Sequence, residues 1–372
     1  MSECTEPINL LGPFQFFTKI TGLEGMTGSS NSGKVIRYLL ALVVIGLLIF
    51  RTVLIVKVDA KILSFGWAEC NLHTALSIFS IICAFCIFGW TKNSFIQKHL
   101  ERLENVRKLR IHPNPTMDQY TRQHRICAIA PLVWLGFWMV ACISNAQDQK
   151  VLFGGQPTSP WFYITYPILT VLAWYIISLC LIFYALIQIS ISREMDYFNK
   201  EVEMELRSLE DPKTAKIYSN RHNEILKLLR EANKKLSSLV NIGLGFNLFA
   251  SVFGLYMADF LFDIPISYGL FALGAMDGVL AITMIILKCS GLVQQKVADT
   301  KRILMDTNFE NRENDRNMQM MKDRCDDPSN CLTVFGIRIS SSSAENFFQF
   351  VPLISTVLLF LKNILKASGL DF

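Results

Sequence analysis

The sequence predicts an all-α, polytopic membrane protein with seven transmembrane helices. Its 372 residues are 51% hydrophobic and have a mean hydropathy of +0.34, values that a soluble domain of this length rarely reaches. Several apolar runs match the roughly 20 residues that a helix needs to cross a bilayer. Basic residues also gather in alternate loops, as they do in multi-pass proteins.

The seven spans follow from the apolar runs, taken in chain order. The fourth run is long enough to project beyond the bilayer, and only Asp-Ile-Pro-Ile separates the fifth from the sixth, so these two form a hairpin. Residues 1–35 form an N-terminal segment, 36–367 a single transmembrane domain, and 368–372 a short C-terminal end. The predicted spans are 36–56, 71–91, 126–145, 161–190, 239–262, 267–288 and 345–367.

The distribution of lysine and arginine predicts the orientation of these spans. Because cytoplasmic loops are enriched in basic residues, the N-terminus is expected in the cytoplasm and the C-terminus outside the cell, in the plasma membrane. Basic residues number eight in 92–125, ten in 191–238 and eight in 289–344, but two in 57–70, one in 146–160 and none in 263–266.

The basic loops also contain helical patterns. Residues 221–240 carry an apolar stripe that needs a partner, either within the chain or in another subunit. Residues 306–331 are strongly charged, and we expect them to be mobile. The stripe consists of Ile225, Leu228, Leu229, Ala232, Leu236 and Leu239.

Charged residues lie inside the first, fifth and sixth predicted spans. Asp277 is ten residues into the sixth span, about 15 Å deep, where an acid must be protonated, paired or wet. A structural hydrogen bond to a neighbouring helix is the simplest role for it. Arg51 is expected to extend toward the outer headgroups, and Asp259 lies about one turn inside the outer end of the fifth span.

Aromatic residues surround Asp259 at the predicted outer side of the membrane. Aromatic rings beside a carboxylate suit a small polar or amphipathic ligand. The same rings also fit the aromatic belt found at the interface of every membrane protein, and the two interpretations remain open. The candidate ligand-binding residues are Tyr163, Tyr166, Tyr256, Asp259 and Tyr268.

The seventh predicted span carries a polar stripe on one helical face. Such a face points to other helices or to water rather than to lipid. It can therefore form a helix–helix seam, with its lysines reaching the outer headgroups, or line a pore. The stripe consists of Glu345, Gln349, Pro352, Ser355, Lys362 and Lys366, and Leu359 interrupts it.

Three stretches of the chain resemble the insect gustatory receptors, relatives of the insect odorant receptors. They are LLGPFQFFTKITGLEGM (10–26), ILKLLREANKKLSSLVNIGLGFNLFASVFG (225–254) and LTVFGIRISSSSAENFFQFVPLISTVLLFLKN (332–363). In the second stretch Leu236, Leu239, Val240 and Asn241 agree with the family pattern, whereas Ala232 replaces its tyrosine. The family's Thr-Tyr and Gln-Phe pairs in the last span are Ser355-Thr356 and Lys362-Asn363 here.

This resemblance implies a tetrameric, ligand-gated cation channel in which the seventh helix surrounds a central pore. Four lysines at position 362 facing that pore would repel cations. Either Lys362 turns aside and Asn363 faces the lumen, or different subunits dilute the charge. The pore-lining residues that the resemblance implies are Gln349, Pro352, Ser355, Leu359, Lys362 and Asn363.

The resulting interpretation is a gustatory chemoreceptor subunit, opened by a small-molecule tastant, in a homo- or hetero-tetramer with related subunits in membrane lipid. We expect no requirement for a G protein, and no nucleic-acid partner. A seven-span G-protein-coupled receptor and a membrane transporter are the alternatives, but the loop charges disfavour the first. No nucleophile, phosphate-binding or metal-ligand motif is present, so we expect no enzyme activity, cofactor or metal.

Overall fold

The computed structural model is almost entirely helical over the part of the chain that it describes. That part comprises residues 10, 12, 14, 16, 31–57, 62, 64–112, 120–129, 131–133, 135–136, 160–205, 212–258, 266–305, 312–334, 336–340, 343, 356–357, 360 and 363–364.

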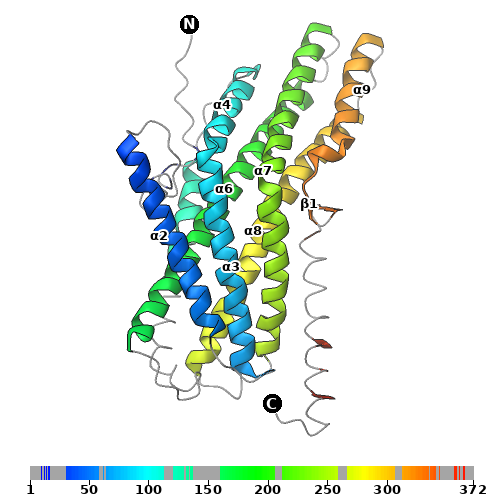
Figure 1. Ribbon diagram of the computed structural model, residues 1–372. Helices are drawn as coiled ribbons and strands as arrows, with labels where there is room; N and C mark the ends of the chain where they lie inside the picture. Colours follow the sequence, from blue (N-terminus) through cyan, green and yellow to red (C-terminus); the bar gives the residue numbers. More distant parts are fainter. Residues whose placement is uncertain are drawn as a thin grey trace.

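Among the described residues, the structure has seven helices with defined bounds, one short 3-10 turn and one two-stranded hairpin; Figure 1 labels the helices and β1. The hairpin is antiparallel and pairs Thr333 with Arg338. The elements are α2 (Asn31–Val56), α3 (Phe65–Lys92), α4 (Phe95–Lys108), α6 (Pro160–Met204), α7 (Pro212–Ala258), α8 (Ile266–Met305), α9 (Arg312–Asp326), η3 (Pro328–Asn330), β1 (Thr333–Val334) and β2 (Ile337–Arg338).

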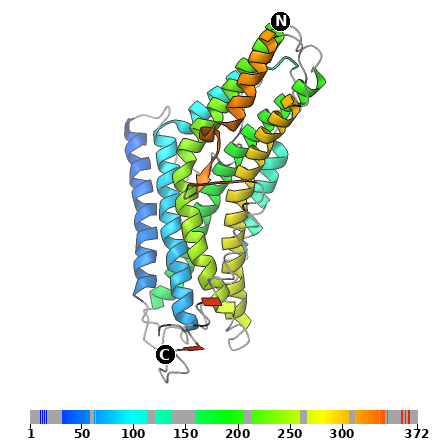
Figure 2. The same cartoon turned by 90° about the vertical axis from the view of Figure 1, so that its right-hand side faces the viewer.

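The five longest helices run alongside one another in a single bundle (Figures 1 and 2). Helix α3 packs against α7, α6 against α8, and α7 against α8. Each of the five is long and apolar enough to cross a membrane, as predicted for spans one, two, four, five and six. Only scattered residues of the third and seventh predicted spans are described, so the full set of seven and its orientation stay predictions.

Two helix boundaries show what the apolar runs do and do not determine. Helix α3 begins six residues before the predicted start at 71, because the Ser64 hydroxyl caps it by accepting a hydrogen bond from the Trp67 amide at 3.1 Å. Helix α6 extends over 45 residues and projects beyond its predicted span, as its length suggested.

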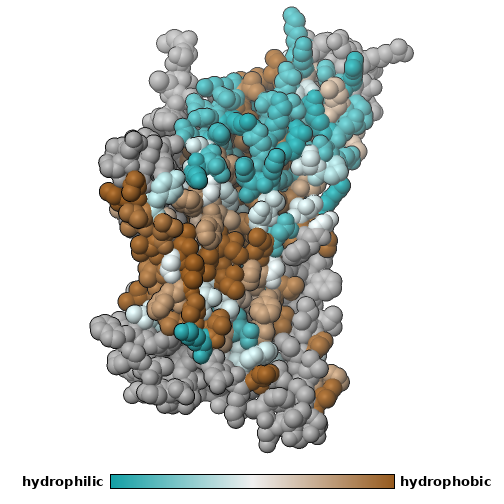
Figure 3. Space-filling view, in the orientation of Figure 1, coloured by the Kyte–Doolittle hydropathy of each residue, from teal (hydrophilic) through white to brown (hydrophobic). Residues whose placement is uncertain are grey.

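The molecule has a hydrophobic part and a hydrophilic end. Figure 3 shows hydrophilic residues gathered where α4 and α9 lie in Figure 1, and a hydrophobic belt over the helices below. We call the hydrophilic end the stalk: α4, α9, η3 and residues 191–204, 212–238 and 289–305. The apolar bundle is the remainder of α2, α3, α6, α7 and α8.

Within the segment 306–331, predicted to be mobile, the described residues 312–331 are folded. Residues 312–326 form α9, which packs against both α7 and α8. Its apolar face is short and buried. Met318 and Met321 are fully buried, and Cys325, one turn later, is buried as well. The charge of this segment belongs to its solvent-facing side and does not prevent folding.

The apolar stripe of α7 finds its partners within the chain. All six of its residues are buried against the neighbouring helices of the same chain. Glu231, on the exposed side of α7, forms an ion pair with Arg102 of α4. The stalk is therefore a folded unit within one subunit.

Candidate functional site

Tyr166 on α6, predicted as a ligand contact, lies in a buried polar group with α2. The Arg51 guanidinium is 5.7 Å from the centre of the Tyr166 ring, and its Nε donates a hydrogen bond to Thr170 Oγ1 at 3.3 Å. Arg51 is only 1% exposed, so the prediction that it extends to the headgroups is wrong. Its charge points into the bundle, where the Tyr166 ring and the Thr170 hydroxyl stabilise it.

Tyr256 on α7, the second predicted contact, is fully buried and packs toward α3. Its ring centre lies 6.4 Å from that of Trp67, which in turn stands edge-on to Phe253 at 5.2 Å. Asp259 and the side chains of Tyr163 and Tyr268 lie outside the described residues. Of the five predicted ligand residues, the structure thus places two in the interior of the bundle.

Helix α3 contributes polar residues that the sequence interpretation missed. Glu69, His73 and Ser77 follow one another at intervals of four, and so share one helical face. His73 is 2% exposed, with its Nε2 4.0 Å from Glu69 Oε1, and Ser77 Oγ lies 2.8 Å from Thr52 Oγ1 of α2. The four-residue spacing inside an apolar run was the signal that could have found them.

Helix α7 buries two polar side chains one turn apart, Asn247 and Ser251. Asn247 is fully buried, and among the described residues neither its amide nor the Ser251 hydroxyl has a hydrogen-bond partner. They lie between two close helix contacts, because a Cβ at Gly243 would meet Phe79 of α3 and one at Gly254 would meet Met276 of α8. A ligand able to hydrogen-bond, or a rearrangement of the helices, would find unused polar groups here.

The predicted pore residues are mostly outside the described part of the chain. This applies to Gln349, Pro352, Ser355, Leu359 and Lys362. Asn363 is described, and it lies exposed in a helical turn. Asp277 on α8 is also exposed, and it makes no hydrogen bond or ion pair with the described residues, so the predicted structural hydrogen bond is not found there.

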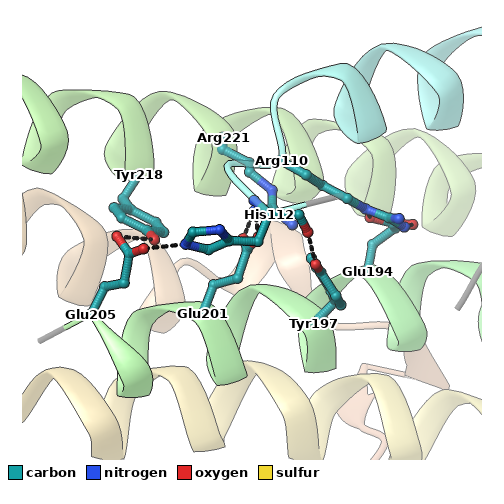
Figure 4. Close-up of polar contacts among 8 residues, drawn as sticks. All are labelled: Arg110, His112, Glu194, Tyr197, Glu201, Glu205, Tyr218 and Arg221. Atoms are coloured by element: carbon teal, nitrogen blue, oxygen red, sulfur yellow. Dashed lines mark hydrogen bonds and ion pairs between the residues drawn. The ribbon is translucent and has the colours of Figure 1, made fainter. Parts of the chain in front are cut away.

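The stalk contains a network of buried charges that spacing along the sequence alone did not reveal (Figure 4). Glu194 of α6 is 1% exposed and binds two arginines from α4 and the turn that follows it. Arg107 Nε donates to Glu194 Oε1 at 3.4 Å, and Arg110 Nε donates to Oε2 at 3.3 Å while its NH2 binds Oε1. The two-point contact with Arg110 fixes the end of α4 against α6.

A second buried acid of α6, Glu201, joins this helix to α7. It lies one helical turn after Tyr197. Glu201 and Arg221 form an ion pair in which each side chain is 1% exposed. The His112 amide donates to the other oxygen of Glu201 at 3.1 Å, and the Tyr197 hydroxyl donates to the His112 carbonyl. Glu201 therefore holds both α7 and the segment after α4.

The exposed edge of this network contains a histidine. The His112 imidazole hydrogen-bonds to Glu205, which raises its pKa above the ordinary value of 6.5. Glu205 also accepts a hydrogen bond from the Tyr218 hydroxyl of α7 at 3.1 Å. Figure 4 shows the acids of α6 pointing from one side of the helix toward these partners.

A second junction fixes the chain where it leaves α9. The Asn330 carbonyl accepts hydrogen bonds from Asn233 of α7 at 3.1 Å and from Gln294 of α8 at 2.8 Å. Asn330 is 1% exposed and belongs to η3, directly before the β1–β2 hairpin. The segment that leads toward the seventh predicted span therefore starts from the α7–α8 groove of the stalk.

The stalk and the apolar bundle differ in the interactions that their side chains can form. The part of the chain that the structure describes holds no cluster of three metal-ligating side chains. The stalk satisfies its charges by mutual pairing, whereas the bundle concentrates aromatic rings, a buried arginine and hydrogen-bonding groups that suit recognition of a small molecule.

Comparisons with known proteins show which family model the chain matches and which solved structure shares its architecture. A family model described as Caenorhabditis protein of unknown function, DUF267, matches residues 10–355. None of the curated proteins matches the chain. The structure is similar to that of the insect olfactory receptor OR5 from Machilis hrabei, with a TM-score of 0.71, 14% identity, and coverage of 93% of this chain and 96% of the receptor.

The same receptor in complex with eugenol gives a TM-score of 0.67 at 13% identity, covering 94% of this chain and 97% of the receptor. The fold inferred from the sequence resemblance is thus confirmed by similarity to an insect olfactory receptor.

Proposed function

The chain belongs to the Caenorhabditis DUF267 family, and we propose that it is a chemoreceptor subunit: a ligand-gated cation channel opened by a small molecule, of the gustatory type. The observation that carries the proposal is the receptor fold shared over nearly the whole chain with the Machilis hrabei olfactory receptor. That receptor has been solved with eugenol bound, which supports a small organic ligand as the class of activator.

The charge pattern supports the orientation within this proposal. The stalk is cytoplasmic, the N-terminus lies inside and the C-terminus outside the plasma membrane. The subunits assemble as a homo- or hetero-tetramer around their seventh helices, without a G protein. The polar and aromatic interior of the bundle then opens toward the outside, where a tastant arrives.

Gating follows from a difference in affinity. A ligand among Tyr166, Tyr256 and their neighbours opens the channel only if it binds more tightly to the open arrangement of helices. The buried ion pairs keep the stalk in one conformation, so the free energy of binding acts on the bundle and on the packing of the seventh helix.

Current recording tests the proposal. The full chain, expressed in a cell line, is exposed to a panel of sugars, bitter compounds and carbon dioxide, with and without G-protein blockade. We expect at least one compound to evoke a cation current that survives the blockade. A response that disappears with the blockade would instead restore the G-protein-coupled interpretation.

A matched pair of variants tests the ligand site. Tyr256→Ala, in the interior of α7, is expected to raise the half-maximal ligand concentration by about tenfold at unchanged surface expression. Phe249→Ala, on the exposed side of the same helix, is expected to respond like the wild type. Equal responses of both variants would place the ligand elsewhere.

A topology measurement tests the orientation separately. A C-terminal epitope tag is expected to be stained on unpermeabilised cells, and an N-terminal tag only after permeabilisation. The reverse result would contradict the channel topology.

A further inference from the structure

The base of the stalk, where it meets the apolar bundle, carries four exposed lysines. Lys92 ends α3, Lys98 lies in the first turn of α4, and Lys234 and Lys235 lie on α7. All four residues are exposed, and none of them forms an ion pair within the part of the chain that the structure describes. We call these four residues the basal lysines.

Helix packing brings basal lysines from different helices to one level. Arg102 of α4 forms an ion pair with Glu231 of α7, and these two helices run in opposite directions (Figure 1). Lys98 comes one turn before Arg102 and Lys235 one turn after Glu231, so each lies about 6 Å from the ion pair along its helix, toward the apolar bundle. Because residues four apart share a helical face, the ion pair is followed by one positive charge on each helix.

Helix α3 sets the depth of this level in the membrane. It is long and apolar enough to span a bilayer and ends at Lys92, and its Trp90 Nε1 donates a hydrogen bond to the Lys235 carbonyl at 3.4 Å. Tryptophan is enriched at membrane–water interfaces, where its ring is buried and its N–H meets polar groups. The basal lysines therefore lie at the membrane surface, at the height of the phospholipid headgroups.

Lysines of the same two helices that lie further from the membrane have acidic partners. Lys108 of α4 forms an ion pair with Glu104, and Lys227 of α7 forms one with Glu224. At the base, Glu231 is the nearest acid along α7 and is already paired, and the first turn of α4 holds no acid. Like charges gathered at one level repel one another, so an anion between the basal lysines is bound favourably.

We propose that the basal lysines bind the headgroup of an anionic phospholipid of the cytoplasmic leaflet, an inositol phospholipid with more than one phosphate. The inference goes beyond the proposed function and rests on one part of it, the cytoplasmic position of the stalk. Charge complementarity identifies the occupant, because lysines at a membrane surface attract anionic lipid and phosphate oxygens accept hydrogen bonds from several ammonium groups. Four lysines from three helices match a headgroup with several phosphates better than a headgroup with one.

The bound headgroup holds α3, α4 and α7 together at the membrane surface. It adds to the ion pair between Arg102 and Glu231, which is exposed and therefore contributes little to stability by itself. The base of the stalk is then fixed relative to the bilayer as well as to the neighbouring helices. The lipid composition of the membrane thus regulates the stalk independently of any ligand in the bundle.

Lipid binding to the purified full chain in detergent tests the proposal. The probe is a water-soluble, short-chain phosphatidylinositol bisphosphate, and its affinity is measured from the rise in melting temperature with probe concentration. We expect Lys98→Gln/Lys235→Gln to weaken binding by about 25-fold, because each lysine beside anionic lipid contributes about fivefold. An affinity equal to that of the wild type would overturn the proposal.

The matched control removes the same charge from the same two helices. Lys108→Gln/Lys227→Gln also lowers the net charge by two, but these lysines lie about 15 Å and about 12 Å along their helices from Lys98 and Lys235. Exposed charges further apart than the Debye length of about 8 Å are largely screened, so we expect the control to bind the probe like the wild type. Equal losses in the two double variants would show a diffuse attraction rather than a site, and would refute the proposal.

Two further probes distinguish the source and the charge of the headgroup. Inositol trisphosphate carries phosphates without acyl chains and is expected to bind the wild type more weakly than the lipid does. Equal binding would assign the basal lysines to a soluble polyphosphate instead. Short-chain phosphatidylserine at the same total charge is expected to raise the melting temperature less, and an equal rise would contradict the need for several phosphates. These measurements use neither a tastant nor a current, so their failure leaves the proposed channel function standing.

Discussion

Arg221 and Arg51 are both 1% exposed, one in the stalk and the other in the apolar bundle. Arg221 forms an ion pair with Glu201, which is buried to the same degree. Arg51 contacts the hydroxyl of Thr170 and the ring of Tyr166. The stalk thus neutralises charge by charge, which fixes the geometry of the helices that carry it. The contacts described for Arg51 in the bundle are to a neutral hydroxyl and an aromatic ring, groups whose interactions a ligand can supplement.

Buried polar atoms without a hydrogen-bond partner among the described residues occur in both regions, but in different settings. In the bundle, the amide of Asn247 and the hydroxyl of Ser251 are buried without a hydrogen-bond partner among the described residues. In the stalk, Glu194 and Glu201 each accept several hydrogen bonds. The unpartnered atoms of the stalk belong to side chains that another contact holds in place, as Glu201 holds Arg221 and the Asn330 carbonyl holds Asn233. Asn247 and Ser251 make no such contact with the described residues, so a change in packing or occupancy can gain free energy there.

The largest expected effect is a loss of stability when a buried ion pair of the stalk is broken. Arg221→Met leaves Glu201 buried without its partner and is expected to lower stability by about 3–5 kcal/mol, measured as thermal unfolding in detergent. Arg102→Met removes an exposed ion pair with Glu231 and is expected to cost about 0–1 kcal/mol. Adding Glu201→Met to Arg221→Met is expected to recover much of the loss. Equal effects of the two arginine variants would contradict the distinction between the buried and exposed pairs.

An intermediate effect on stability is expected when a buried polar side chain of the bundle is replaced. Asn247→Leu replaces a buried amide by an apolar group of similar size, and is expected to raise stability by about 1–3 kcal/mol. The same variant is expected to weaken the ligand-evoked current, because the hydrogen-bonding group is lost. The matched substitution Asn233→Leu in the stalk, where the amide donates to Asn330, is expected to lower stability. A destabilised Asn247→Leu would mean that this amide is already paired in the native protein.

The smallest effect concerns pH at the edge of the stalk. Because Glu205 raises the pKa of His112, their contact stabilises the fold fully below the ordinary pKa of 6.5 and is lost as pH rises through the higher folded value. We expect the melting temperature of the wild type to exceed that of His112→Gln by a small margin at about pH 5.5, and the two to converge toward pH 9. A margin that grows with pH would have the wrong sign for this contact.

The sequence predicted most of the fold because long apolar runs and the α7 stripe are dominated by hydrophobic burial. Helices α3, α6, α7 and α8 lie where these patterns placed them. Helix α9 was missed because its short face of Met318, Met321 and Cys325 is outnumbered by charged residues, and only contact with α7 and α8 makes that face sufficient. Composition averaged along the segment concealed the periodicity.

The candidate site was harder to predict, because its residues come from different helices. Tyr166 and Tyr256 were predicted through their aromatic character, and the structure shows that both are buried, while their role in ligand binding stays a prediction. Arg51 was assigned to the headgroups, because its position along α2 does not indicate the direction it faces. Glu194 and Arg110 are 84 residues apart, and no spacing rule connects them. Helix packing, not local pattern, brings such pairs together.

The unbroken length of α6, α7 and α8 has a mechanical consequence. Helix α6 spans 45 residues, about 68 Å, from the stalk through the bundle. If ion pairs hold its stalk end as a pivot, a tilt of about 5° displaces the opposite end by roughly 6 Å, with no hydrogen bond of the helix broken. The helix then acts as a lever. A small rotation about its fixed stalk end produces, at the other end, a displacement comparable to the width of a pore.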